Sequence, residues 1–202
     1  TYMTNDLSSF YLDFTKDILY IEKADSHARR CIQTVIYKIA LALAKLLTPI
    51  IPHTAEEVYS YMPGNKEDSI YLCEMPDCVK YPNADELTAK FAEFNLLRAD
   101  ILKALEEARN AKVIGKSFAA EVTLYPAPHV AKLIKTLNFN LGQVFIVSKF
   151  NLSTTEIDGV QYDSGTIKVE AAKGVVCSRC WQVVDEINED ELCPRCAEVL
   201  KK

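Results

Sequence analysis

The chain has 202 residues, a formal net charge of −5 and a hydrophobic content of 49%. This length suits one ordinary domain with a small module, or two small domains, and the hydrophobic share is sufficient for a core. The acidic balance excludes a general nucleic-acid coat protein, which would be strongly basic, but it is compatible with a local basic patch.

Targeting signals are not visible in the sequence. The first ten residues, TYMTNDLSSF, lack the charged start and the apolar run of a signal peptide, and no uncharged apolar stretch is long enough to span a membrane. We therefore expect a cytoplasmic protein without a membrane partner. Because the chain begins with Thr1 rather than Met, we expect it to be either a piece cut from a longer protein or a processed chain.

The first part of the chain predicts four helices, because apolar residues recur there at intervals of three and four. Proline and glycine residues are expected to end the second and third helices, since neither residue continues a helix well. Four such helices predict a helical bundle. The helices are expected over residues 6–20, 27–47, 54–62 and 83–111.

Two of these helices carry more specific predictions. The helix over 27–47 has almost no polar face, so we expect neighbours to bury it on several sides, with Cys31 as a small core residue. The following helix is predicted to begin with a capping box, in which the side chains of Thr54 and Glu57 satisfy each other's free backbone amides.

The pattern changes near Ile114, where short β-type segments and turn signals begin. Strands are expected over 119–126, 143–150 and 166–172, with a short helix over 127–137. The predicted fold class is therefore mainly α: a helical bundle, then a small α/β junction unit, then a module with four cysteines. The corresponding domains are residues 1–112, 113–173 and 174–202.

The last thirty residues contain two Cys-x-x-Cys pairs, in the stretch CSRCWQVVDEINEDELCPRC. Two such pairs complete a tetrahedral shell of four thiolates, which is typical of structural zinc because it leaves no position for a substrate. Two disulfides are the alternative, disfavoured by the odd number of cysteines and the missing secretory signal. A segment this short and polar cannot build its own core, so metal binding would supply its folding free energy. The expected ligands of one Zn²⁺ ion are Cys177, Cys180, Cys193 and Cys196.

The only tryptophan, Trp181, directly follows the first cysteine pair. It is either the hydrophobic plug of the small module or, beside Arg179, a stacking face for an unstacked RNA base. The residues alone do not separate these two interpretations.

A second candidate RNA contact lies at the end of the long helix. Arg109, Lys112 and Lys116 follow helical spacing, with Arg98 on roughly the same face, and such a stripe can track a phosphate backbone. A solvated charged face is the commoner explanation, and neighbouring glutamates can pair with these cations. No catalytic residues are predicted, because the sequence contains no phosphate-binding glycine loop and no recognised nucleophile or metalloprotease motif.

Several segments together resemble bacterial-type isoleucyl-tRNA synthetases. They are SSFYLDFTKDILY, QTVIYKIALALAKLLTPIIPHTAEEVYSYMPG, LLRADILKALEEARNAKVIGKSFAAEVTLY and the terminal CSRCW and CPRC, in this order, and they cover nearly the whole chain. A similar four-cysteine finger also ends some DNA-repair glycosylases. The helical segments decide between the two families, because they resemble the anticodon-binding bundle of class I synthetases.

The resemblance implies a function for the chain as part of a larger enzyme. Such an enzyme activates isoleucine with ATP and charges isoleucine tRNA, using N-terminal catalytic and editing domains whose signature motifs do not occur here. In the family, the zinc module folds over the anticodon loop, and an Arg-Cys-Trp motif corresponds to Arg179, Cys180 and Trp181. The chain is thus expected to be a monomeric tRNA-recognising fragment that is inactive alone.

Two alternatives from other classes stay open at this point. One is a freestanding zinc-ribbon module whose partner is another protein, with the helices presenting an apolar groove. The other is a complete small enzyme, which the missing nucleophile and phosphate motifs disfavour.

Overall fold

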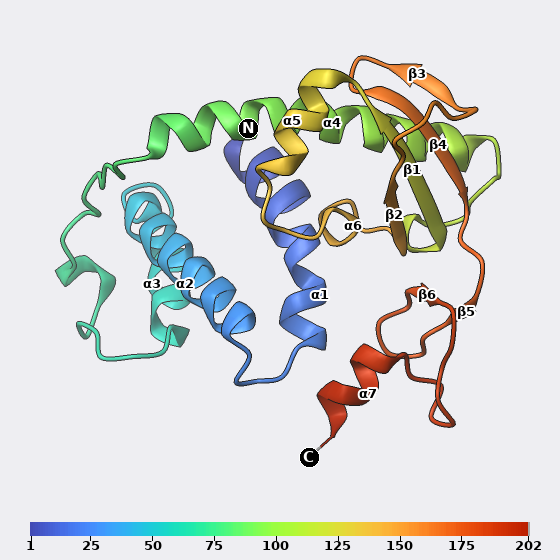
Figure 1. Ribbon diagram of the computed structural model, residues 1–202. Helices are drawn as coiled ribbons and strands as arrows, with labels where there is room; N and C mark the ends of the chain where they lie inside the picture. Colours follow the sequence, from blue (N-terminus) through green and yellow to red (C-terminus); the bar gives the residue numbers. More distant parts are fainter. Residues whose placement is uncertain (202) are drawn as a thin grey trace. The chain divides into compact units, whose positions relative to one another are not determined.

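The computed structural model describes residues 1–201, and the chain divides into two compact units. Unit 1 comprises Thr1–Ile21 and Asn83–Lys202, and unit 2 comprises Glu22–Pro82. The chain has more helices than strands, and the helices contain more of its residues (Figure 1). None of the described helices is long and apolar enough to cross a lipid bilayer. The units follow contacts in space and do not test the three sequence-derived domains, which stay predictions.

Unit 2 is a pair of helices with a looping connection. Helix α2 (His27–Leu47) packs on α3 (Pro52–Tyr61), and the chain then forms a single 3₁₀ turn, η2 (Ile70–Leu72). The Glu56 carboxylate accepts hydrogen bonds from the backbone of Ile70 at 2.9 Å and from the Ser69 hydroxyl at 3.0 Å, which fixes this turn against α3. The small core consists of Ala44, Ala55, Tyr59, Met62 and Ile70.

Three expectations about unit 2 are wrong in detail. Helix α3 begins at Pro52, because proline has a preset φ and needs no amide donor in the first helical turn, so Thr54 lies inside the helix and forms no capping box. On α2 only Ala44 is fully buried, so this helix is not covered on several sides. Cys31 is exposed, with its sulfur 3.6 Å from a ring nitrogen of His27, and is not a core residue.

Unit 1 is built on two helical segments and a sheet. The N-terminal segment starts with wide π-helical turns, η1 (Tyr2–Leu12), and continues as α1 (Asp13–Ile21). The long helix α4 (Ala84–Asn110) begins after Asn83, as predicted, and its apolar stripe is buried. After a 3₁₀ turn, η3 (Ser117–Ala119), the chain enters the sheet.

The sheet has four strands in the order β2-β1-β4-β3. The central strand β1 pairs in parallel with β2 and antiparallel with β4, so residues 120–126 of β1 lie opposite residues 165–171 of β4. Helix α5 (Pro128–Lys135) follows β1. The strand bounds are β1 Ala120–Pro126, β2 Lys149–Leu152, β3 Val160–Tyr162 and β4 Gly165–Ala171.

The predictions for β1, α5 and β4 are confirmed, but the strand predicted over 143–150 is wrong in its first half. Asn140 accepts a hydrogen bond from the amide of Gln143 and starts the short helix α6 (Leu141–Val144), and Ile146 adopts a left-handed φ of 58° after it. Strand β2 therefore begins only at Lys149. A short apolar run is compatible with either structure, because both bury it.

One hydrophobic core joins α4, α5, α6 and the sheet. Phe94 of α4 is fully buried and packs against the rings of Phe10, Phe139 and Phe145 at centroid distances of 5.4–6.3 Å. The sheet contributes Val122, Leu124 and Ile167 to the same core. The core thus holds the sheet and helices α4, α5 and α6 together. The remaining elements are the hairpin β5 (Val175–Val176) and β6 (Val183–Val184) and helix α7 (Pro194–Leu200).

Candidate metal centre and nucleic-acid interface

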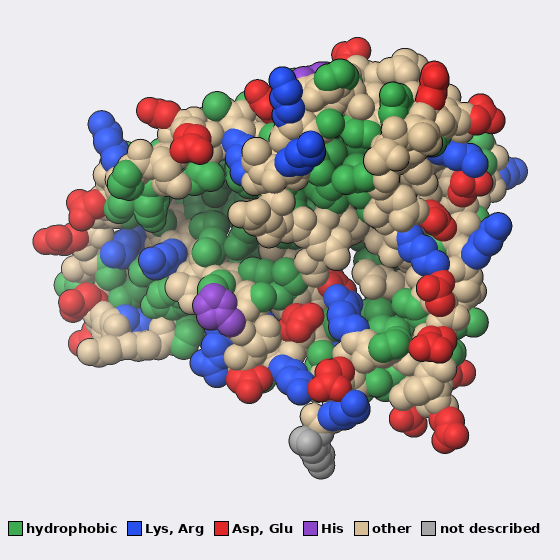
Figure 2. All heavy atoms as spheres, viewed as in Figure 1, with side chains coloured by type: hydrophobic (Ala, Val, Ile, Leu, Met, Phe, Trp, Pro, Cys, Tyr) green, Lys and Arg blue, Asp and Glu red, His purple; other side chains and the backbone are tan. Residues whose placement is uncertain are grey.

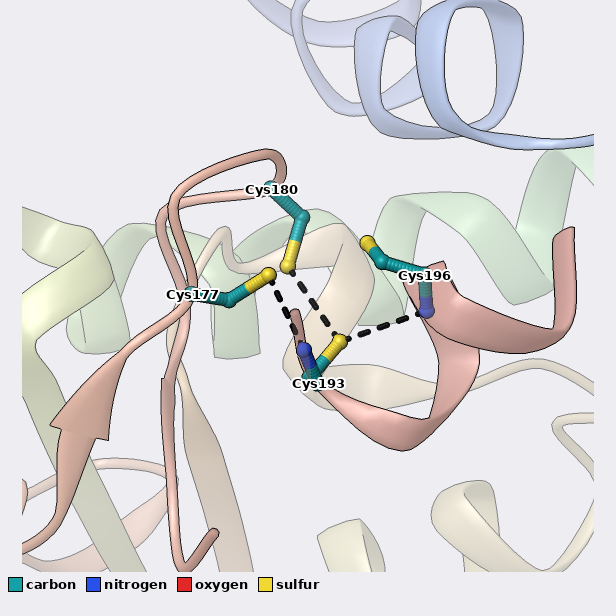
Figure 3. A group of neighbouring side chains, drawn as sticks. All are labelled: Cys177, Cys180, Cys193 and Cys196. Carbon is teal, nitrogen blue, oxygen red and sulfur yellow. Dashed lines mark hydrogen bonds between the residues drawn. The ribbon is translucent and has the colours of Figure 1, made fainter. Parts of the chain in front are cut away.

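The four predicted ligands converge on one point. The sulfur atoms of Cys177, Cys180, Cys193 and Cys196 all lie within 4.8 Å of one another, and all four residues are buried. Figure 3 shows the first pair on the hairpin and the second at the start of α7, with the sulfurs facing each other. This arrangement requires a backbone that turns sharply close to each pair.

The sequence provides these turns. Gly174, at φ +139°, lets the chain pass so close to Val184 that a Cβ atom would lie 2.1 Å from its carbonyl oxygen. At the other pair, Cys193 is the N-cap of α7, and its sulfur accepts a hydrogen bond from the amide of Cys196 at 3.4 Å. Pro194 follows at the first helical position, where no amide donor is needed.

The cysteines differ in their tendency to ionise. Burial opposes ionisation of Cys177, but hydrogen bonds from the backbone amides of Cys180, Cys193 and Arg179 outweigh it and lower the pKa of this thiol to about 6. Burial raises the pKa of Cys180 to about 12, and burial also raises the pKa of Cys196.

A divalent cation fits this site on two grounds. Zn–S bonds of about 2.3 Å in a tetrahedron place sulfur atoms about 3.8 Å apart, and the sulfurs of Cys180 and Cys193 are 3.8 Å apart. Four thiolates around a divalent cation carry a net charge of about −2, which needs nearby positive charge. Arg179 and Arg195 each have a buried N–H without a hydrogen-bond partner among the described residues, and both lie near enough to the cysteines to affect thiol and guanidinium pKa values.

The structure gives Arg179 a position that the sequence did not predict. Its guanidinium donates hydrogen bonds to the carbonyl oxygens of Ile21 at 2.7 Å and Tyr20 at 3.4 Å, at the C-terminal end of α1. Arg179 is thus partly committed to the protein itself, and its role toward RNA stays a prediction.

Trp181 is 66% exposed, so it does not plug the interior of the module. It adopts a left-handed φ of 63°, and its amide donates to the carbonyl of Cys177 at 2.9 Å. A bulky residue in this conformation costs about 1–3 kcal/mol, and such strain persists only where the surrounding turn enforces it. The cysteine turn therefore holds an indole ring in solvent, beside the metal site.

The three predicted basic residues do not share a helix face, contrary to the spacing argument. Helix α4 ends at Asn110, and Lys112, at φ 59°, turns the chain away, so Lys112 and Lys116 lie in the connection to the sheet. Both are exposed. Arg109 pairs with Glu106 and donates to the Ser117 hydroxyl at 3.2 Å. Arg98 is occupied elsewhere, over the ring of Phe10.

Acidic side chains gather in the loop of the cysteine module that connects its two Cys-x-x-Cys pairs. The loop between β6 and α7 is rich in exposed carboxylates, and Figure 2 shows acidic groups in this region. These carboxylates repel phosphate groups, so this side of the module is unfavourable for a nucleic-acid backbone. The exposed acidic residues are Asp185, Glu186, Glu189, Asp190 and Glu191.

A set of polar residues joins the module to the rest of unit 1, and no sequence pattern indicates these contacts. Asp17 of α1 forms a two-fold ion pair with Arg195, at 2.7 and 2.6 Å, and accepts a hydrogen bond from Gln143 at 2.8 Å. Burial raises the pKa of Asp17, but the hydrogen bonds from Arg195 and Gln143 and the charges of Arg195 and Arg179 outweigh it, so the pKa lies below its ordinary value. Residues so far apart in sequence show no common periodicity.

Comparisons with known proteins place these features in a family. Residues 1–124 match the model of the anticodon-binding domain of tRNA ligases. The whole chain is 46% identical to isoleucine--tRNA ligase of Bacillus cytotoxicus and 48% identical to the enzymes of the same name from Bacillus cereus and Bacillus anthracis. The chain spans 23% of the length of these relatives. The chain therefore belongs to the family of tRNA ligase anticodon-binding domains.

Proposed function

We propose that this chain is the tRNA-recognising part of an isoleucine--tRNA ligase. The observation that carries the proposal is the similarity of the entire chain, helices and cysteine module together, to one part of enzymes with that name. A freestanding zinc-ribbon protein is disfavoured, because it would have no reason to share the helical segments of a tRNA ligase.

The parts of the chain have distinct roles in this proposal. Residues 1–112 form the helical anticodon-binding bundle, 113–173 the junction unit and 174–202 the zinc module. One structural Zn²⁺ ion, held by the four cysteines, cross-links the module. The catalytic and editing domains that use ATP and isoleucine belong to the rest of the enzyme, and the whole acts as a monomer in the cytoplasm.

Recognition of the anticodon centres on Trp181 in this proposal. Its exposed ring offers a face for an unstacked base, and stacking on an aromatic ring contributes about 1–3 kcal/mol per base. Lys112 and Lys116 are exposed cations that can contact phosphates, with Arg109 and Arg179 as further contacts that must share their existing partners.

A fluorescence anisotropy titration at low salt tests the proposal. The protein is titrated with isoleucine tRNA and with the same tRNA carrying a swapped anticodon, first with zinc bound and then after chelation. We expect tighter binding of the native anticodon, and loss of that preference on chelation. Equal binding of both tRNAs by the zinc-loaded protein would contradict the role of this chain as the anticodon reader.

A further inference from the structure

Helix α1 ends at Ile21, beside the four cysteines. Its last turn contains no basic residue, and the carbonyl groups at a helix C-terminus carry a partial negative charge that needs a donor or a cation. The cysteine module supplies both, because Arg179 donates to the carbonyl oxygens of Tyr20 and Ile21. Ile21 also packs directly among the four buried cysteines. The end of α1 is thus completed by Arg179, which is 158 positions from Ile21 and 159 positions from Tyr20 in sequence.

A second connection lies one turn back along the same helix. The Asp17 side chain is only 12% exposed. Its carboxylate accepts hydrogen bonds from both terminal nitrogens of Arg195 and from the side-chain amide of Gln143. Such a two-pronged pair fixes orientation as well as distance. Breaking one partner of a pair this enclosed leaves the other charge poorly compensated.

Arg195 also belongs to the metal site by position. It lies between the ligands Cys193 and Cys196, and its guanidinium interacts with Cys180. The turn that carries Arg195 is therefore the same turn that presents the sulfurs of Cys193 and Cys196 to a metal. Arg179 has the matching place between Cys177 and Cys180 of the first pair.

We propose that Asp17 is a positioning residue that couples metal occupancy of the four cysteines to the order of helix α1. Metal binding fixes the turns that carry Arg179 and Arg195. Arg179 then holds the last carbonyl groups of α1, and Arg195 holds Asp17. In turn, an ordered α1 pre-organises both arginines for the charged metal site. The consequence for RNA, a fixed placement of Trp181 relative to α1, rests on the proposed function.

Hydrogen exchange measured by mass spectrometry on the full-length protein tests this coupling. With zinc bound, we expect the amides of Asp13–Ile21 to be protected, and chelation should increase their exchange rate about tenfold, within the usual range of coupling between sites. In Asp17→Asn loaded with zinc, the same amides should already exchange at the faster rate. Protection of α1 that is unaffected by chelation in the wild type would overturn the proposal.

Asp13→Asn is the matched control, since Asp13 lies on the same helix in an exposed ion pair with Lys16 at 2.9 Å. It should retain the wild-type response to zinc. Coupling between sites is reciprocal, so Asp17→Asn must also weaken zinc binding by about the same factor, as measured by competition with a chromophoric chelator. Zinc affinity equal to that of Asp13→Asn would overturn the proposal as well.

Arg195→Lys carries the same test if Asp17→Asn does not fold, because lysine keeps the charge and loses the two-pronged geometry. It should show faster exchange of α1 and weaker zinc binding, and wild-type values for both would refute the coupling. None of these measurements uses RNA, so their outcome is independent of the tRNA titration. The coupling can fail while the anticodon preference stands, and the reverse also holds.

Discussion

The four-stranded sheet and the cysteine hairpin belong to the same compact unit, yet different forces hold them. The sheet shares a large core with α4 and α5, in which Phe94, Leu124 and Phe145 are almost completely buried. The hairpin has two-residue strands, and its buried cluster consists of Ile21 and the four cysteines. Hydrophobic burial stabilises the first region. The second has polar contacts with its neighbours and four clustered cysteines that can hold a metal ion, so we expect it to be the more sensitive to its environment.

The largest expected effect is loss of the metal. Cys193→Ser should release zinc and bring the amides from residue 174 onward to fast hydrogen exchange, because zinc binding contributes about 10–16 kcal/mol in small zinc-folded peptides. The sheet amides should stay protected, since their core contains no cysteine ligand.

Cys78→Ser is the control, because this exposed cysteine lies outside the cluster. Metal content is measured by atomic emission and exchange by mass spectrometry. If the sheet lost protection together with the hairpin, the two regions would form one cooperative unit and the contrast between them would be wrong.

Removing the central ring of the hydrophobic core should destabilise the sheet region and leave the cysteine hairpin with its zinc. Phe94→Ala should lower the free energy of unfolding by about 3–5 kcal/mol, the usual cost of deleting a buried phenylalanine, with zinc content unchanged. Urea denaturation followed by circular dichroism measures the loss. Phe91→Ala, at a ring that is 38% exposed on the same helix, should cost clearly less. Equal losses for the two variants would contradict the assignment of Phe94 to the centre of the core.

Local patterns predicted the elements well and their long-range connections poorly. The long helix α4, strands β1 and β4 and the cysteine pairs follow from periodicity and spacing, which are properties of neighbouring residues. Strand β3 was not predicted because three residues show too little alternation. The apolar run before Lys149 was assigned to a strand, although Asn140 and Ile146 give it a helical turn.

The candidate site shows the same limit. The four cysteines that cluster there could be named from the sequence, because each cysteine pair is local. The ion pair of Asp17 with Arg195 could not, since it joins residues 178 positions apart that lie on elements of different type. The basic stripe failed for a related reason: Lys112 leaves the helix through a left-handed φ, which a spacing rule cannot anticipate for lysine.

The hairpin and the sheet region also differ in their aromatic rings. Trp181 of the hairpin is exposed, whereas Phe94 and Phe145 of the sheet region are buried. Trp181→Ala should weaken binding of isoleucine tRNA about tenfold, a loss within the range for one stacked base, and leave zinc content and hairpin protection unchanged. Anisotropy titration measures the first and hydrogen exchange the second. Val176→Ala, at another exposed apolar residue of the hairpin, should leave the affinity unchanged. Unfolding of the hairpin in Trp181→Ala would instead restore the structural plug.

The segment between α4 and the sheet, which carries Lys112 and Lys116, should contribute a smaller and purely electrostatic part of the tRNA affinity. Lys116→Ala should reduce the slope of the logarithm of tRNA affinity against the logarithm of salt concentration by about one, the value for one lost phosphate contact. Lys132→Ala removes an exposed charge from α5 and is the control. An unchanged slope in Lys116→Ala would show that this connection does not touch the RNA.

The smallest effect is a pH dependence of the contact between α1 and the hairpin. Because the pKa of Asp17 is lower in the folded protein than in the unfolded chain, its ionised form contributes stability above the ordinary carboxyl pKa of about 4, and this contribution disappears as pH falls through the lowered value. The difference in urea midpoint between wild type and Asp17→Asn should therefore be constant from pH 7 to about pH 5 and should close below about pH 4. Because Asp17→Asn is expected to bind zinc more weakly, both proteins are measured with zinc in large excess, so that the comparison isolates the carboxylate that faces Arg195, Arg179 and Gln143. A difference that persisted in acid would mean that Asp17 acts through its shape and hydrogen bonds rather than its charge, and the hairpin would then resemble the sheet more closely than its composition suggests.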